Sequence, residues 1–156
     1  MKIEYHEDIA APADFVFRRL SDVDRHERQA LRRGVEVVRL GGTAPVGPGS
    51  AWSIAFNYRG RRRTVRAEIT DLTPPRRLRI DAVAGGLNFT TLVMVVPLSP
   101  TLTRVNVAVN LAPQTITARL LVQSLKLARG TVTDRLKGRL TELGAEIATA
   151  WSRRQN

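Results

Sequence analysis

The order of periodic segments along the chain constrains its fold more than any other feature. An alternating segment at residues 2–9 comes first, further alternating segments fill the middle, and one apolar-striped segment runs from about Gln114 to Trp151. Alternation with period two indicates strands, and an apolar stripe with period 3.6 indicates a helix. A sheet and a long amphipathic helix bury both apolar faces when the sheet curves around the helix. We therefore predict an α+β fold in which a curved antiparallel sheet wraps around a long C-terminal helix.

The chain length and the residue types that are missing set the outer limits. We expect a single domain over residues 1–156, because a chain of this size can bury its own core. The sequence has no cysteine, which excludes disulfides and thiolate metal sites and is compatible with a reducing cytoplasm. The first eight residues are too charged for a signal peptide, and no apolar run approaches the roughly 20 residues that span a bilayer. We expect a cytoplasmic protein.

Turn and capping residues divide the chain between the periodic segments. Pro12 stands at an early helical position, and a second short helical segment from Asp24 ends before Gly34. Two short helices are therefore predicted after the first strand. Arg59-Gly60 and Gly85-Gly86 then separate alternating segments, as hairpin turns do. These turns predict an antiparallel meander through the middle of the chain.

Several of these segments carry a resemblance to a known family. They are Ile9-Ala10-Ala11-Pro12, Val16-Phe17-x-x-Leu20-Ser21-Asp22, Thr73-Pro74-Pro75-Arg76-Arg77-Leu78 and the long final helix. Over essentially the whole chain they resemble the START-like helix-grip superfamily, also called SRPBCC or polyketide cyclase/dehydrase-like. The resemblance implies a deep cavity between the final helix and the sheet. Because members include lipid carriers, aromatase/cyclases and ubiquinone-binding proteins, it implies the fold more closely than the function.

Residues on the inward faces of the predicted elements should line this cavity. We expect the ligand-binding side chains to be Tyr5, Trp52, Ile54, Phe56, Tyr58, Ala67, Ile80, Val107, Leu120, Ala128 and Val132. A lining that consists mostly of carbon favours a hydrophobic small molecule, such as a lipid, a quinone or a polyketide-like chain.

Glu7 is the main candidate for catalysis. It takes the place of an apolar residue in the alternation of the first strand, so its carboxyl group is expected to face the cavity. An inward carboxyl group can serve as acid, base or ligand anchor. Tyr5 and Tyr58 could supply hydroxyl partners, whereas the alternation around Arg66 points its side chain outward.

The two histidines are expected to be exposed. His6 falls on the polar side of its strand, and His26 lies in the charged segment Asp24-Arg25-His26-Glu27-Arg28. Neither has the neighbours that a catalytic triad or a metal site needs. No iron–sulfur motif can form without cysteine, and we expect no resident metal or cofactor.

The charge of the chain is strongly basic, at +11, and arginine carries nearly all of it. Clusters at Arg59, Arg61–Arg63 and Arg76–Arg79 could attract an acidic partner, a nucleic acid or an anionic membrane surface. Arginines are spread over every segment, however, and no specific nucleic-acid-binding motif is present. This distribution favours a solvated arginine-rich surface. A monomer and a homodimer both fit the sequence.

Three functions remain open. A binder or carrier of a hydrophobic small molecule, without catalysis, fits the apolar lining and is favoured. A polyketide cyclase or dehydratase would use Glu7 with a tyrosine to move protons, but the alternation predicts few inward polar groups. A basic interaction module would instead use the arginine clusters.

Overall fold

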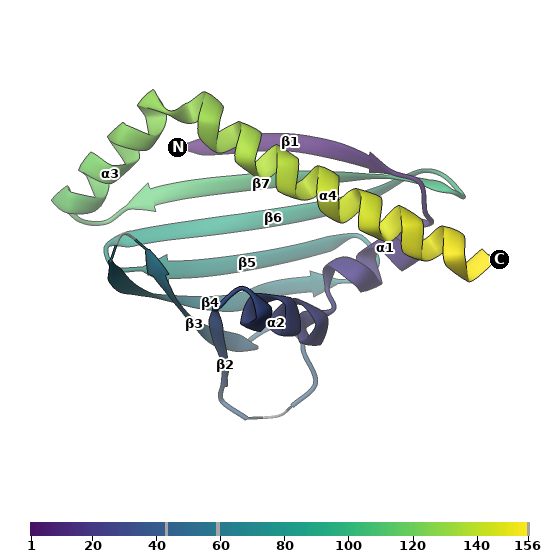
Figure 1. Cartoon of the computed structure of the whole chain (residues 1–156), viewed down its shortest axis with the longest axis horizontal. Coiled ribbons are helices and arrows are strands. Elements are labelled where there is room, and N and C mark those ends of the chain that lie inside the picture. Colours follow the sequence, from purple (N-terminus) through teal and green to yellow (C-terminus); the bar gives the residue numbers. More distant parts are fainter. Residues whose placement is uncertain (43, 59, 156) are drawn as a thin grey trace.

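The described residues, 1–42, 44–58 and 60–155, form a curved seven-stranded sheet and four helices in a computed structural model of the chain (Figure 1). The strands are β1 (Lys2–Ile9), β2 (Glu36–Leu40), β3 (Ala51–Tyr58), β4 (Arg61–Thr73), β5 (Arg77–Ala84), β6 (Leu87–Ser99) and β7 (Leu102–Pro113). The helices are α1 (Ala13–Leu20), α2 (Val23–Arg32), α3 (Ile116–Leu127) and α4 (Arg129–Gln155). Arg59 of the predicted hairpin lies outside the described residues.

The strand order confirms the predicted antiparallel fold. The strands run β1-β7-β6-β5-β4-β3-β2 across the sheet, and every neighbouring pair is antiparallel. Strands β2 to β7 form a meander, while β1 joins the far edge beside β7. The chain therefore has to cross from β1 to β2 at the opposite edge, and α1 and α2 make this crossing (Figure 1). A register shift between Ile69 and Asp71 marks a bulge in β4, which adds to the bending of the sheet.

The turn from β1 into α1 is the most buried part of the chain. Ile9 and Val16 are almost fully buried there, together with Val105 and Thr103 from β7. The Thr103 hydroxyl donates a 2.7 Å hydrogen bond to the carbonyl of Ala11. A buried hydroxyl needs such a partner, because an unpaired polar group in a core is costly. This bond ties the strand-to-helix turn to β7.

The predicted long C-terminal helix is confirmed as α4, but it begins at Arg129 rather than near Gln114, because residues 116–127 form the separate helix α3, which meets α4 at an angle at Ala128 (Figure 1). A straight helix from Gln114 to Trp151 would be about 57 Å long. A 13-residue strand such as β6 spans only about 43 Å, so one helix would overrun the sheet. The break lets α3 bury Ala118 and Val122 while α4 runs along β1 and buries Leu140, Gly144 and Ile147. Within the described residues, no helix is long and apolar enough to cross a membrane.

Candidate functional site

A pocket of about 330 Å³ lies between α2 and the face of β2–β5 that turns toward the helices. Most of its lining is aliphatic or aromatic, with side chains from α2 on one side and from the sheet on the other. The lining residues are Leu20, Ser21, Val23, His26, Glu27, Ala30, Val35, Val37, Trp52, Ile54, Ala67, Ile69, Leu78 and Ile80. This volume is at the lower end of the range for small-molecule sites, about 300–1,000 Å³. The pocket can therefore hold the apolar part of a modest ligand.

Two titratable side chains of the lining, His26 and Glu27, come from α2. The Trp52 indole Nε1–H donates a 2.7 Å hydrogen bond to Glu27 Oε1. The His26 Nε2 atom lies 2.9 Å from the Leu20 carbonyl oxygen. Because a carbonyl only accepts, Nε2 must carry the proton, which leaves Nδ1 of a neutral imidazole free to accept. His26 and Glu27 therefore line this pocket mainly with their carbon atoms, while Glu27 Oε1 and His26 Nε2 are held by Trp52 and the Leu20 carbonyl.

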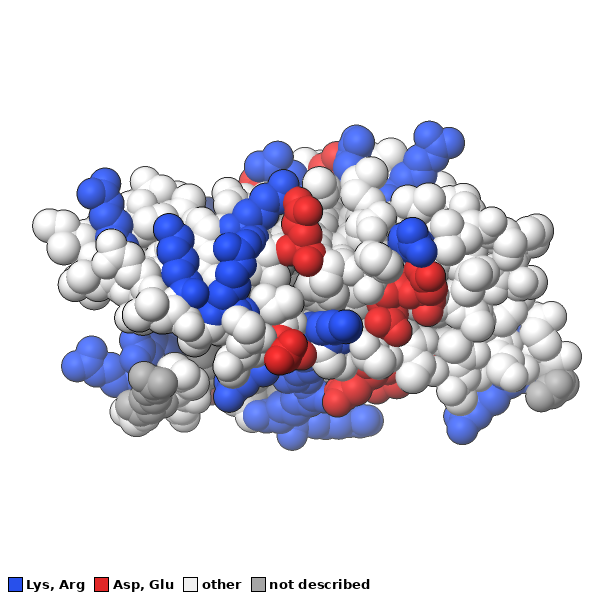
Figure 2. Space-filling view, turned by 90° about the horizontal axis from the view of Figure 1, so that it is seen from above, with Lys and Arg blue, Asp and Glu red and all other residues white. Residues whose placement is uncertain are grey.

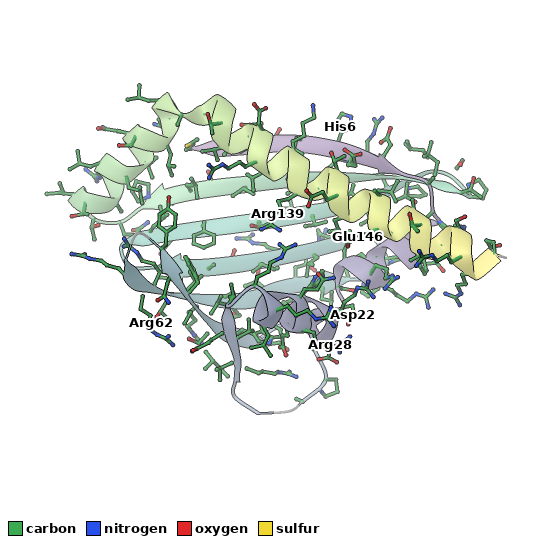
Figure 3. All side chains as sticks on the ribbon, viewed as in Figure 1. His6, Asp22, Arg28, Arg62, Arg139 and Glu146 are labelled. Carbon is green, nitrogen blue, oxygen red and sulfur yellow. The ribbon has the colours of Figure 1, made fainter. Side chains whose placement is uncertain are left out.

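A second pocket, of about 360 Å³, adjoins the first between α2 and α4. The two pockets share His26, Ala30 and Val35. Charged groups line the second one from both helices, in contrast to the aliphatic first pocket. Its other lining residues are Gln29, Arg33, Arg139, Glu142, Leu143 and Glu146. Figure 3 shows Arg139 and Glu146 on α4, across from α2, which Asp22 caps and which carries Arg28.

The pocket brings together only part of the predicted ligand-binding set. Trp52, Ile54, Ala67 and Ile80 line it. Seven predicted residues are absent from its lining. Of these, Tyr5, Phe56, Val107 and Val132 are half-buried, and Tyr58, Leu120 and Ala128 are exposed. The exposure of Leu120 and Ala128 follows from the break between α3 and α4, which turns α3 away from the stripe of α4.

Tyr5 and Glu7 both lie at the contact between β1 and α4. The Tyr5 hydroxyl donates a 2.6 Å hydrogen bond to the Leu136 carbonyl, and burial raises its pKa above the usual value. Glu7 Oε2 accepts a 3.1 Å hydrogen bond from the Thr141 hydroxyl. A Cβ at Gly144 would lie 3.3 Å from Glu7 Cγ, so the glycine allows β1 to approach the helix closely. Neither pocket between α2 and its neighbours includes Glu7 or Tyr5 in its lining.

The two histidines differ in their surroundings. His6 is exposed, as predicted (Figure 3). The expectation of an exposed His26 was wrong, because this side chain is half-buried and lines both pockets. The apolar residues Val23 and Ala30 are seven positions apart, so His26 and Glu27 between them share the inward face of α2. This spacing was available in the sequence, but the surrounding charges obscured it. Among the described residues, no group of histidines and carboxylates could hold a metal ion.

Ion pairs neutralise part of the two arginine clusters. Arg62 pairs with Glu36 at 2.6 Å, and this guanidinium lowers the pKa of the Glu36 carboxyl group. In the second cluster, Arg77 pairs with Asp71 and Arg79 pairs with Asp81. All of these arginine side chains are about half exposed or more. Pairs of this kind fit a solvated surface.

The fold is shared by solved structures that have little sequence identity to this chain. A protein of Thermus thermophilus superposes with a TM-score of 0.69 at 16% identity, and covers 96% of this chain and 99% of its own. The Zhui aromatase/cyclase of Streptomyces sp. R1128 gives 0.67 at 17% identity, covering 94% and 93%. A point mutant of Thalictrum flavum norcoclaurine synthase, in complex with a transition-state analogue, gives 0.68 at 14%, covering 100% and 96%. At such identities the likeness concerns the fold alone.

The sequence itself places the chain in a family. Comparison with curated proteins finds no match. Residues 1–148, however, match the family described as polyketide cyclase/dehydrase and lipid transport. The matched region leaves out only the last eight residues of the 156-residue chain, and the helix-grip fold agrees with it. The chain is therefore a member of the polyketide cyclase/dehydrase and lipid transport family, which is of the SRPBCC type.

Proposed function

We propose that the protein binds an amphipathic small molecule, with its apolar body in the pocket beneath α2 and its polar end between α2 and α4. One observation carries this proposal: an aliphatic pocket and a charged pocket adjoin and share His26, Ala30 and Val35. Apolar walls with a few polar groups at one end are typical of ligand sites that fix orientation. The family description, which includes lipid transport, supports the same class of ligand.

The charges of the second pocket favour an uncharged polar end on the ligand. Arg33 and Arg139 contribute two positive charges, and Glu142 and Glu146 contribute two negative charges. A strongly anionic head group would gain from the arginines but would be repelled by the glutamates. A carbonyl or hydroxyl group can instead accept from an arginine or donate to a glutamate. We therefore favour a ligand that ends in carbonyl or hydroxyl groups.

The apolar pocket alone is too small to give tight binding. A chain of about eight methylenes gains about 6 kcal/mol from burial at about 0.8 kcal/mol each. Micromolar binding needs about 8 kcal/mol, and association itself has an entropic cost. Hydrogen bonds at the polar end must supply the remainder. The ligand is thus expected to depend on both pockets.

A second candidate is a cyclase-like enzyme, and the placement of His26 and Glu27 favours it. An imidazole and a carboxyl group at the edge of an apolar pocket can move protons of a bound carbonyl compound. The Streptomyces aromatase/cyclase with a similar fold supports this reaction class. In this candidate His26 and Glu27 take the proton-transfer role that the sequence had suggested for Glu7 and a tyrosine.

Native mass spectrometry of the purified chain, followed by denaturing extraction, tests the binding proposal. The expected result is a stoichiometric small-molecule adduct that Ala67→Phe abolishes, because Ala67 lines the apolar pocket. Thr70→Phe, on the same strand but exposed, is the matched control and should keep the adduct. An apo mass that persists after exposure to a panel of lipids and quinones would contradict the proposal.

Glutamine variants of the two titratable pocket residues separate a carrier from an enzyme. With a poly-β-carbonyl thioester as probe, His26→Gln and Glu27→Gln should abolish any conversion but keep binding if the protein is a cyclase. A carrier would return the probe unchanged from the wild-type protein as well.

A further inference from the structure

Helix α3 is apolar on two opposite faces. Ala118 and Val122 are buried against the sheet end, as expected for a packed helix. Ile116, Leu120 and Leu127 are nevertheless 77%, 59% and 93% exposed. At about 100° per residue these three side chains fall within about 40° of one another around the helix axis, roughly opposite the buried pair. We call Ile116, Leu120 and Leu127 the outer stripe of α3.

The outer stripe has cations beside it and no acidic residue on its helix. Arg119 and Lys126 lie on one flank of the stripe, by the same angular count. Neither side chain makes an ion pair or a hydrogen bond with another described residue, unlike Arg62, Arg77 and Arg79 in the two arginine clusters. The sequence contains no aspartate or glutamate between residues 82 and 133. The combination is an exposed apolar stripe with unpaired positive charge.

The surface around α3 shows the same bias. In Figure 2 the left end of the molecule, where α3 lies, carries lysine and arginine side chains among uncoloured residues. Acidic side chains in this view begin only toward the middle of the molecule (Figure 2). Large exposed aliphatic side chains gathered in one place mark a contact with a partner rather than ordinary surface.

We infer that α3 docks the protein on the surface of an anionic lipid bilayer. The outer stripe would enter the boundary between head groups and acyl chains, while Arg119 and Lys126 remain at the level of the lipid phosphates. Interfacial helices combine an apolar face with flanking lysine and arginine in this way. This inference does not depend on the pocket beneath α2, because no residue of the outer stripe lines it.

A second copy of the chain is a poorer occupant of this face. In a two-fold dimer through α3, the same patch meets itself. The Arg119 and Lys126 side chains of both copies would then approach each other with no carboxylate on either helix. Like charges that face each other across an interface oppose association. An anionic bilayer supplies the missing negative charge.

Vesicle co-sedimentation of the full chain tests the inference. The probes are vesicles of phosphatidylcholine alone and vesicles with one-third phosphatidylglycerol, at an ionic strength of about 0.15 M, where long-range attraction is screened. Binding is expected to the phosphatidylglycerol vesicles. Leu120→Glu with Leu127→Glu should weaken it at least about tenfold, since each change removes an apolar contact and adds a negative charge.

A charge-matched control separates docking from general attraction between a basic protein and anionic lipid. Val96→Glu with Leu98→Glu adds the same charge at exposed positions near the end of β6. This control should bind within about twofold of wild type, because two negative charges added far from α3 change the screened attraction little. Equal weakening by both double variants would overturn the inference.

Two further measurements distinguish the other outcomes. All variants should keep the wild-type unfolding midpoint, because the changed side chains are exposed, and the α3 variant should keep its pocket ligand. Sedimentation equilibrium without lipid should show the same mass for wild type and the α3 variant. If wild type is a dimer and the α3 variant is a monomer, a second copy of the chain covers this face. That result would overturn the membrane inference.

Discussion

Tyr5, Glu7 and Gly144 determine how closely β1 approaches α4. Tyr5 and Glu7 bond to the backbone of Leu136 and the hydroxyl of Thr141 on the helix. The alternation of β1 led us to expect the Glu7 carboxyl group in the cavity, whereas it meets the Thr141 hydroxyl on α4 and lines neither pocket. The hydrogen bond from Thr141 on α4 explains why β1 carries the acidic residue Glu7 at this position.

Gly144→Val should destabilise the protein. A Cβ at this position would lie 3.2 Å from Ile9 Cγ1 and 3.3 Å from Glu7 Cγ, so a branched side chain forces β1 and α4 apart. Overpacking of this kind costs about 1–3 kcal/mol of unfolding free energy. Chemical denaturation measures the change. Gly138→Val in the same helix is the control, because nothing lies within 4 Å of its added Cβ, and an equal loss there would contradict this packing.

Tyr5→Phe should lower stability by about 0.5–1.5 kcal/mol through loss of the bond to the Leu136 carbonyl. Tyr5→Phe should also change how the free energy of unfolding falls at alkaline pH. Burial raises the pKa of Tyr5 above the ordinary value of 10.0, so the unfolded chain ionises first as pH rises. This contribution is fully present below pH 10.0 and is lost as pH rises through the higher folded pKa. Urea titrations from about pH 8 to about pH 11 should show a shallower decline for Tyr5→Phe, and parallel declines would contradict it.

At the scale of elements, alternation predicted the strands correctly, and the division of the C-terminal helix was missed. Successive residues of β3, β4 and β7 alternate between the buried and the exposed face of the sheet, so a short stretch of sequence is enough to identify each strand. At about 100° per residue, Leu120 and Leu127 lie on one side of a continuous helix and Leu136 and Leu140 on the opposite side, so the apolar stripe changes phase near Ala128. This phase change was a local signal for the break, and the single-stripe prediction overlooked it. The angle between the two helices depends on where the sheet ends, which is a property of the assembled fold. Likewise, α2 was predicted as a helix, but its charged residues concealed its inward face.

Leu140→Ala tests which part of the stripe packs on the sheet. Leu140 is 6% exposed and belongs to the core, so its truncation should cost about 2–5 kcal/mol. Leu120→Ala, on the outer stripe of α3, should change the unfolding free energy by less than about 0.5 kcal/mol. Leu136 is only half-buried, and its truncation should fall between these two. Similar losses for Leu140 and Leu120 in urea denaturation would show that α3 does not expose its outer stripe.

At the scale of the whole molecule, the sheet and helices enclose space in one place and leave a helix face uncovered in another. The sequence indicated a cavity through the family resemblance, but it placed three of the ligand-binding residues, Leu120, Ala128 and Val132, on the first half of the final helical segment, away from the pocket. The pocket instead lies beneath α2, where residues from β2 to β5 converge on a helix that is distant in sequence. Such convergence depends on strand order and sheet curvature, which no single segment encodes.

The two tryptophans provide the most direct test of the central claim that a ligand binds beneath α2. Trp52 lines the apolar pocket and donates its indole N–H to Glu27, whereas Trp151 packs on Phe15 near the end of α4 and is absent from the pocket lining. The measurement is a titration of the protein with a medium-chain fatty alcohol or a short-chain quinone, followed through the two indole N–H resonances by NMR. The account predicts a saturable shift of the Trp52 resonance and little change at Trp151. A saturable shift confined to Trp151, or no shift at either indole with any ligand of this class, would contradict it.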